Sequence, residues 1–294
     1  RPALSVLRSQ FAAIGDDIEL RNAFISKNLN RLVGIGFSYY DVISIRNSMR
    51  KIMPSEYTDS YAVGGVDLAE TTDLCNATAM VLTSEKLLVL QVYFIAEQTL
   101  ERNSEADKQD YFSMTNLDTG DRVTSELVVI TPGAYVRKEY VTDWFVMLRD
   151  VYKINFLKIG YDRALAKEWL TNMIENGFSH EKVEKNKETG EIERDYGILT
   201  EVAQGGWTLS EPIKITRRLI EMGKIVADSR NKLFVYCFNN LKIRQDVNNN
   251  LSPHKAKSTG HIDGAIGVLN AFVGYDRAKN LKEYQEYLSK YFCV

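Results

Sequence analysis

The 294-residue sequence contains few of the residue types that build disulfide scaffolds, zinc sites and membrane spans. Its cysteines, Cys75, Cys237 and Cys293, lie far apart and form no CxxC pair, which argues against a disulfide framework and a structural zinc site. The three histidines are too few and too scattered for a metal cluster. No apolar run approaches the roughly 20 residues needed to span a bilayer, and no apolar signal core is visible. These absences favour a reducing, intracellular compartment.

The net charge is small, because 37 Lys and Arg face 39 Asp and Glu, but it is unevenly distributed. Residues 61–130 contain 12 acids and 4 bases, whereas residues 213–258 contain 10 bases and 3 acids. A near-neutral total therefore does not exclude a local basic surface that binds a phosphate backbone, although a solvated charged face is the alternative. With 45% apolar residues, the chain is long enough for one large domain, or one domain with an appendage.

The first part of the chain reads as helical up to about residue 56, since apolar residues recur there at spacings of three to five. A change to strand-like runs follows at 61–67, 74–82 and 87–96, with a turn at 83–86. Three consecutive strands predict an antiparallel meander. Because the chain opens on Arg-Pro without an initiator Met, we also expect it to be a piece of a longer polypeptide.

From residue 136 onward, helix and strand patterns alternate. Residues 156–160 and 198–202 read as buried strands, Ser210 as the N-cap of a helix to about Met222, and residues 262–273 as an apolar helix followed by a polar C-terminal helix. The charged segment 180–196 suggests a protruding hairpin around a Thr-Gly pair, or a solvated loop. A meander followed by such alternation predicts an α/β fold with a mixed central sheet flanked by helices.

Three aspartates stand where chemistry is plausible. Asp67 ends the first strand after Gly64-Gly65, Asp162 follows the strand that ends at Gly160, and Asp263 begins the apolar helix. Taken singly, each is an ordinary cap or turn residue. Together they can converge on one edge of the sheet, where clustered carboxylates resist ionisation unless a cation lies between them. Their hard oxygen ligands suit Mg²⁺ or Mn²⁺, and two such ions support phosphodiester hydrolysis.

At this point the sequence resembles the nuclease domain of tailed-bacteriophage large terminase subunits, an RNase H-like fold. The resemblance covers about residues 60–277. The matching segments stand in family order: GGVDLAETTDL (64–74), YVTDW (140–144), IGYDR (159–163), VAQG (202–205), LSEPIK (209–214) and HIDGAIG (261–267). Each segment is short, but six in the right order are hard to obtain by chance.

The resemblance implies an endonuclease that cuts concatemeric viral DNA during genome packaging by two-metal hydrolysis. The family's metal-binding acids correspond to Asp67, Asp162 and Asp263, with Asp67 bridging two Mg²⁺ or Mn²⁺ ions; hydrolysis would leave 5′-phosphate and 3′-hydroxyl ends. Asp73 corresponds to an auxiliary acid, with a turn residue as the alternative. We expect four bases to contact the double-stranded DNA substrate, or to be loop charges: Lys242, Arg244, Lys255 and Lys257.

Large terminases usually carry a packaging ATPase before the nuclease, but no G-x-x-x-x-G-K-[ST] loop is present here. We therefore expect residues 1–56 to be the helical linker or tail of a missing ATPase, and residues 57–294 to be the nuclease domain. The resemblance also implies a portal and a small terminase subunit as partners. It implies the cytoplasm of an infected bacterium as the location, with no membrane association and no secretion.

Two other hypotheses remain open. Gly65-Val66-Asp67 followed by Thr71-Thr72 also resembles the first phosphate loop of actin-like kinases and ATPases, although the later glycine pairs do not repeat it. Alternatively, the acids are structural and the chain is a non-catalytic docking module. The three tryptophans, Trp144, Trp169 and Trp207, do not decide between these hypotheses, because we expect all three in the core.

Overall fold

The structure is a computed structural model that describes residues 4–13, 39–69, 74–102, 112–115, 122–124, 127–185, 192–258 and 260–278. Its strands are β1 (Met49–Arg50), β2 (Tyr61–Asp67), β3 (Cys75–Leu82), β4 (Leu87–Ala96), β5 (Phe112–Thr115), β6 (Arg122–Thr124), β7 (Val128–Thr131), β8 (Asn155–Tyr161), β9 (Lys182–Lys185), β10 (Ile192–Tyr196), β11 (Leu199–Glu201), β12 (Ile225–Asp228), β13 (Ile243–Gln245) and β14 (Leu251–Pro253). Its helices are α1 (Leu4–Ala13), α3 (Val42–Asn47), α4 (Glu97–Arg102), α6 (Lys138–Asp150), α7 (Lys167–Glu175), α8 (Gly206–Glu221), α9 (Lys232–Asn240) and α10 (Asp263–Ala278), with 3-10 turns η1 (Pro54–Tyr57) and η2 (Lys255–Lys257).

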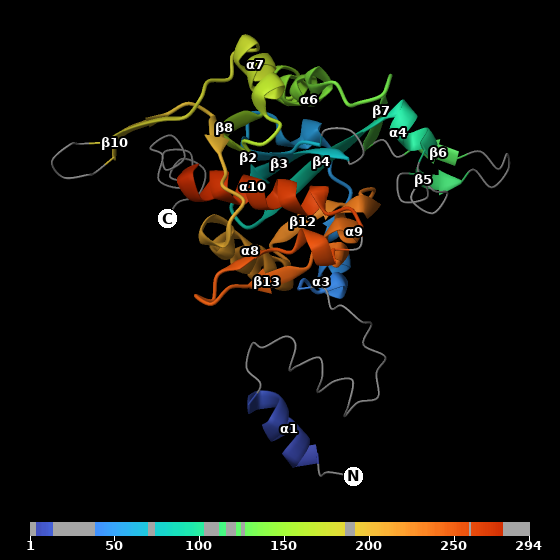
Figure 1. The fold of residues 1–294 in the computed structure, drawn as a ribbon, viewed down its shortest axis with the longest axis vertical. Coiled ribbons are helices and arrows are strands. Elements are labelled where there is room, and N and C mark those ends of the chain that lie inside the picture. The colour runs from blue at the N-terminus through green and yellow to red at the C-terminus, as the bar shows by residue number, and fades with distance from the viewer. Residues whose placement is uncertain are drawn as a thin grey trace.

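A mixed eight-stranded sheet organises the fold (Figure 1). The strand order is β1-β12-β4-β3-β2-β8-β11, and β7 also pairs with β4. Strand β3 runs antiparallel to β2 and β4, while the other pairs in this sheet are parallel. The predicted meander and the predicted mixed sheet are both confirmed. Because β2, β8, β11 and β12 all point the same way, their carboxyl ends lie along one edge of the sheet.

Helices cover both faces of this sheet, which explains why every residue of β3 and β4 is buried. Helix α10 crosses one face together with α8 and α9, and α6 and α7 cover the other. On the second face, Phe145 of α6 packs edge-to-face on Phe156 of β8, with the fully buried Trp169 of α7 nearby. Among the described residues, no helix has both the length and the apolarity needed to cross a membrane.

Paired glycines allow α10 to lie unusually close to the sheet. Gly65 of β2 is opposite Gly160 of β8. A Cβ atom on Gly65 would lie 2.1 Å from the Gly267 carbonyl oxygen, and one on Gly160 would lie 2.2 Å from the Asn270 carbonyl oxygen. Both positions therefore exclude any side chain, which is the close approach expected from Gly64-Gly65.

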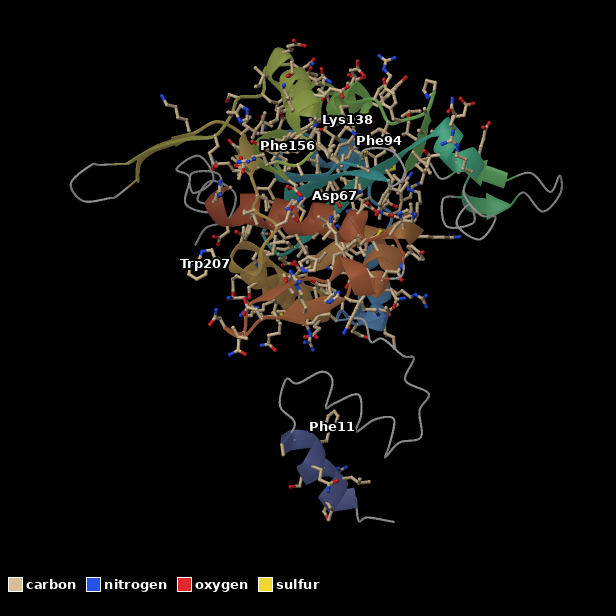
Figure 2. All side chains as sticks on the ribbon, viewed as in Figure 1. Phe11, Asp67, Phe94, Lys138, Phe156 and Trp207 are labelled. Atoms are coloured by element: carbon tan, nitrogen blue, oxygen red, sulfur yellow. The ribbon has the colours of Figure 1, made fainter. Side chains whose placement is uncertain are left out.

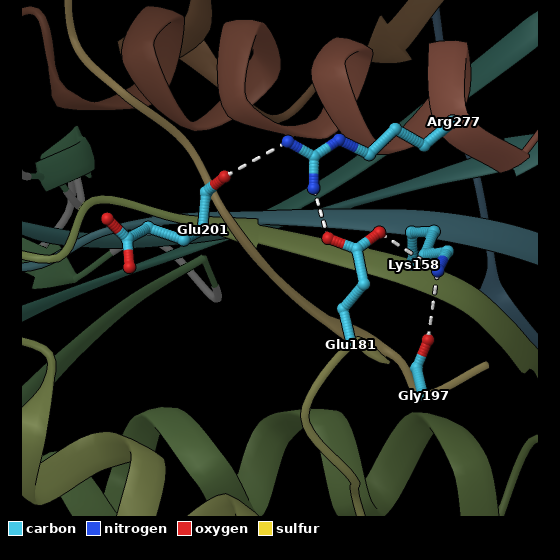
Figure 3. Close-up of polar contacts among 5 residues, drawn as sticks. All are labelled: Lys158, Glu181, Gly197, Glu201 and Arg277. Carbon is cyan, nitrogen blue, oxygen red and sulfur yellow. Dashed lines mark hydrogen bonds and ion pairs between the residues drawn. The ribbon is translucent and has the colours of Figure 1, made fainter. Parts of the chain in front are cut away.

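The segment predicted to form a hairpin does so, because β9 pairs antiparallel with β10 and the pair projects from the body of the molecule. A buried ion-pair cluster fixes its base (Figure 3). Lys158 of β8 is fully buried, and its Nζ lies 3.0 Å from Glu181 Oε1 and donates to the Gly197 carbonyl at 3.1 Å. Arg277 of α10 pairs with the other oxygen of Glu181.

Two predictions around α8 are wrong. The helix begins at Gly206 with Gly205 as its N-cap, and Ser210 lies buried inside it, where its hydroxyl accepts a hydrogen bond from the Leu251 N–H at 3.1 Å. Trp207 is 92% exposed rather than in the core. It precedes the buried Leu209 by two residues, about 200° around a helix, and therefore faces away from the sheet.

Other predictions fall on residues outside the described ranges. The polar C-terminal helix lies entirely beyond residue 278, and Asp73 lies in the gap between Ala69 and Leu74. In the segment before residue 56, the structure describes residues 4–13, which form α1, and residues from 39 onward, where α3 spans residues 42–47. The division of the chain at residue 56 stays a prediction.

Candidate active site

The carboxyl ends of β2 and β8 bring two of the three predicted aspartates side by side. The parallel register of β2 and β8 pairs Gly65 with Gly160 and Val66 with Tyr161. Asp67 and Asp162 are therefore the next residues along these two neighbouring strands. Because side chains alternate along a strand, Asp67 lies on the same face as Gly65, the face covered by α10. Asp162 begins the turn after β8, where its Oδ1 accepts a hydrogen bond from the Ala164 N–H at 3.1 Å.

Helix α10 brings the third aspartate to this face. Asp263 is only 8% exposed and shares a helical stripe with Gly267, Asn270 and Gly274, at spacings of four, three and four residues. Gly267 lies against Asn76, which is the register partner of Asp67 on β3. The first turn of α10 therefore faces the sheet beside the row of residues that contains Asp67.

The thiol of Cys237 on α9 is influenced by both carboxylates. Burial raises the pKa of the Cys237 thiol well above its usual range, and the negative charges of Asp263 and Asp67 raise it further. The Cys237 thiol thus lies within the electrostatic reach of both aspartates. It stays protonated at neutral pH, so it serves as a small apolar residue rather than as a ligand or nucleophile.

A buried hydrogen-bond network supports the start of α10, and its centre is Gln91 of β4. Gln91 Nε2 donates to the Gly264 carbonyl at 2.7 Å and to Thr78 Oγ1 at 2.8 Å. Its Oε1 accepts from the Tyr93 hydroxyl at 2.9 Å and from Asn231 Nδ2 at 3.0 Å. The sequence reasoning missed these positioning residues, although one glutamine inside an apolar strand was a signal. The network fixes Asp263 by fixing the residue next to it.

A second polar link holds α10 over the end of β2. Asn270 Nδ2 donates to the Val66 carbonyl at 2.7 Å, and Asn270 Oδ1 accepts from Gln204 Nε2 at 2.9 Å. Lys138 of α6 fixes the chain that follows Asp67, since its buried ammonium group donates to the Ala69 carbonyl. The backbone on both sides of Asp67 is therefore tied to neighbouring helices.

Asp263 carries the feature that fits a cation. Its Oδ2 atom is buried and accepts no hydrogen bond from any described residue, although His261 Nδ1 lies 3.4 Å away. Within the residues that the structure describes, no three Asp, Glu, His or Cys side chains lie close enough together to hold a metal ion. The three aspartates share one edge of the sheet without forming a closed ligand set. An oxygen-only donor set with an unsatisfied buried oxygen fits Mg²⁺ or Mn²⁺ rather than zinc.

The four predicted DNA-contacting bases lie together on the hairpin β13–β14 and the turn that follows it. The Lys242 backbone donates to Ser258 Oγ at 3.3 Å and accepts from the His254 N–H at 2.7 Å, which joins the hairpin to η2. Lys255 and Lys257 of η2 are exposed, as is Arg244 of β13. Burial lowers the pKa of Lys242. This basic group leads directly to Asp263 in the sequence.

Comparison with known proteins identifies the family of the chain. The chain matches the family described as terminase large subunit, endonuclease domain, over residues 5–278. The crystal structure of the bacteriophage HK97 large terminase is similar, with 19% identity and a TM-score of 0.62, and the match covers 94% of this chain and 51% of that one. The chain thus spans about half the length of that large terminase.

The large terminase nuclease of the thermophilic phage G20c also matches, at 11% identity and a TM-score of 0.46, over 80% of this chain and 97% of that one. A magnesium-bound structure of the G20c nuclease gives 10% identity and a TM-score of 0.44. No curated protein matches the chain. At these identities the structural likeness concerns the fold alone, while the family match spans nearly the whole chain. This chain therefore belongs to the family of terminase large subunit endonuclease domains.

Proposed function

We propose that the chain is a metal-dependent endonuclease that cuts concatemeric viral double-stranded DNA during genome packaging. One observation carries this proposal. Asp67 and Asp162 lie next to each other at the carboxyl ends of the paired parallel strands β2 and β8, and Asp263 faces the same side of the sheet with a buried oxygen that accepts no hydrogen bond from a described residue. A structural carboxylate in such a position is normally paired.

In this proposal, Asp67, Asp162 and Asp263 hold two divalent ions at the carboxyl edge of the sheet. Bound Mg²⁺ or Mn²⁺ would lower the pKa of a water molecule and offset charge on the leaving oxygen in phosphodiester hydrolysis. The chain's own contribution is position: Gln91 and Asn270 fix α10 over the ends of β2 and β8. The bases of β13–β14 and η2 would hold the DNA backbone without reading sequence.

Three finer assignments belong to the same proposal. Asp73 is an auxiliary metal ligand, and residues 1–56 link the nuclease to a packaging ATPase. The portal and the small terminase subunit are its partners in the complete packaging machine.

The test is cleavage of supercoiled plasmid by the purified chain in millimolar Mn²⁺, with EDTA as the blank. We expect Asp67→Asn and Asp162→Asn each to lower the rate more than about 100-fold, because loss of even an outer-shell partner of a metal site costs about 10- to 100-fold. Calorimetric titration with Mn²⁺ should show weaker binding in the same variants.

The matched control is Asp143→Asn, which removes an exposed aspartate of α6, on the opposite face from α10. It should cut at the parental rate. If the parent does not cut, or if Asp67→Asn cuts as fast as the parent, the three-aspartate site is wrong. Nucleotide binding without DNA cleavage would instead support the actin-like alternative, and neither activity would support a docking module.

A further inference from the structure

An exposed tryptophan lies at the start of α8, and an exposed valine lies in the adjoining turn between β13 and β14. Trp207 is 92% exposed, and Val247, in the turn between β13 and β14, is 97% exposed. Figure 2 shows Trp207 at the surface of the molecule. The two elements adjoin, because a Cβ on Gly206 would lie 3.1 Å from Asn250 Cβ. We call Trp207 and Val247 the apolar tip. A single exposed valine is ordinary, but a tryptophan this exposed is not.

Hydrogen bonds fix the backbone of the turn that carries Val247. Asp246 Oδ1 accepts hydrogen bonds from the Asn248 and Asn250 N–H groups, both at 2.8 Å, which closes the turn that carries Val247. These bonds lower the pKa of Asp246. A hydrogen bond from the Leu251 N–H to the Ser210 hydroxyl also anchors this hairpin to α8. Both apolar side chains are therefore presented to solvent by a defined backbone.

The apolar tip lies on the same edge of the sheet as the candidate active site. Strand β11 pairs with β8, with Glu201 opposite Tyr161, so the chain leaves the sheet beside Asp162. Trp207 follows Val202 by five residues, which span at most about 17 Å. Along a duplex, whose rise is about 3.4 Å per base pair, this distance corresponds to about five base pairs. Trp207 thus lies close enough to the end of β11 for a duplex bound at Asp67 and Asp162 to reach it when the duplex runs toward α8.

Charge around the apolar tip favours nucleic acid over a protein partner. Lys242 and Arg244 belong to the same hairpin as Val247, and Lys255 and Lys257 follow it. The nearby Asp246 is engaged in its own turn. A protein interface typically has few charged residues near its centre, whereas DNA-binding surfaces are strongly basic.

We propose that the apolar tip is a DNA contact of this nuclease, with Trp207 packing on bases or sugars while the neighbouring bases hold phosphates. This inference rests on the proposed function, because it assumes that duplex DNA reaches the carboxyl edge of the sheet. Such a contact tolerates any sequence, since every base has an aromatic face. Its place beyond the aspartates predicts an effect on binding rather than on hydrolysis itself.

The experiment measures binding of a labelled 20-base-pair duplex by fluorescence anisotropy in EDTA, where no cutting occurs. We expect Trp207→Ala to weaken the affinity about tenfold, in the range found when an aromatic stacking partner is removed. Trp207→Phe should restore most of the affinity, and Val247→Ser should have a smaller effect. Val151→Ala, which truncates a 67% exposed residue at the end of α6, is the matched control and should bind like the parent.

Salt dependence and a small substrate separate this proposal from the proposed function. Trp207→Ala should keep the parental slope of affinity against salt, whereas Lys255→Ala should lower that slope by about one. Hydrolysis of bis(p-nitrophenyl) phosphate with Mn²⁺ should be unchanged in Trp207→Ala; a parent without this activity contradicts the proposed function and not the DNA contact. Parental duplex affinity in Trp207→Ala overturns the contact. An effect of this variant only in the presence of other packaging proteins would also overturn it, and would assign the surface to a protein.

Discussion

The two ends of α10 differ in whether a buried carboxylate is paired with basic side chains. At its C-terminal end, Glu181 is paired with Lys158 and Arg277, and the buried lysine donates a further hydrogen bond to a carbonyl (Figure 3). At its N-terminal end, the Asp263 side chain is nearly as buried, yet no Lys or Arg among the described residues pairs with it, and His261 Nδ1 lies 3.4 Å from its Oδ2. A carboxylate that serves the fold has its charge balanced by the protein. Asp263 instead keeps a buried oxygen that accepts no hydrogen bond from the described residues, which is what the proposed role as a metal ligand requires.

The largest effect should come from the N-terminal end. We expect Asp263→Asn to lower the rate of plasmid cleavage more than about 100-fold while changing the free energy of unfolding by less than about 1 kcal/mol. The stability effect is small because the oxygen that is replaced accepts no hydrogen bond from the described residues, and what is lost is mainly a favourable charge at a helix start. Urea unfolding and plasmid cleavage measure the two quantities. A loss of several kcal/mol would assign Asp263 to the fold.

The opposite result is expected at the C-terminal end. Glu181→Ala removes the carboxylate that pairs with the buried Lys158, so it should destabilise the protein by about 3–5 kcal/mol. The cleavage rate per folded molecule should fall far less than in Asp263→Asn. The double variant Glu181→Gln with Lys158→Met should recover much of the lost stability, because an apolar replacement of a buried ion pair is often neutral. If the single variant is as stable as the parent, the cluster does not hold the hairpin base.

The contrast between the two ends also explains what could be predicted from the sequence. The strands β2, β3, β4 and β8 were predictable because apolar runs with turn residues at their ends dictate them locally. The positions of Asp67 and Asp162 at the sheet edge were predictable because these residues end or follow two of those strands, while their role as metal ligands stays a prediction. The hairpin β9–β10 was predictable because a Thr-Gly pair with polar flanks is a local turn signal.

The remaining features depend on contacts between distant residues. Nothing local places Asn270 on the carbonyl of Val66, or shows that Lys158 inside a strand finds Glu181. Strand β12 and helix α9 were missed, because a four-residue strand carries little periodicity of its own. The start of α8 was misplaced because Ser210 followed by Pro212 has the local signature of a helix start, whereas packing against β14 decided the outcome. Trp207 was assigned to the core by residue type alone.

The smallest effect concerns a further carboxylate, at the same sheet edge as Asp67 and Asp162. Asp228 ends β12, and it is paired like Glu181, since Arg230 Nη2 lies 2.7 Å from its Oδ2. Burial by itself would raise the pKa of Asp228, but hydrogen bonds from Arg230 outweigh burial, and the net shift is downward. A carboxyl whose folded pKa lies below its unfolded value of about 3.9 adds stability above about pH 4, and this contribution is lost as the pH falls through the folded pKa.

Asp228→Asn should therefore lower the free energy of unfolding at pH 7, and the difference from the parent should shrink as the pH falls below about 4. Urea titrations between pH 3 and 7 measure this difference, because the midpoint shifts while the slope stays constant. A pH-independent difference for Asp228→Asn would show that Arg230 acts through hydrogen bonding to either side chain rather than through charge. The contrast between paired and available carboxylates would then rest on Glu181 and Asp263 alone.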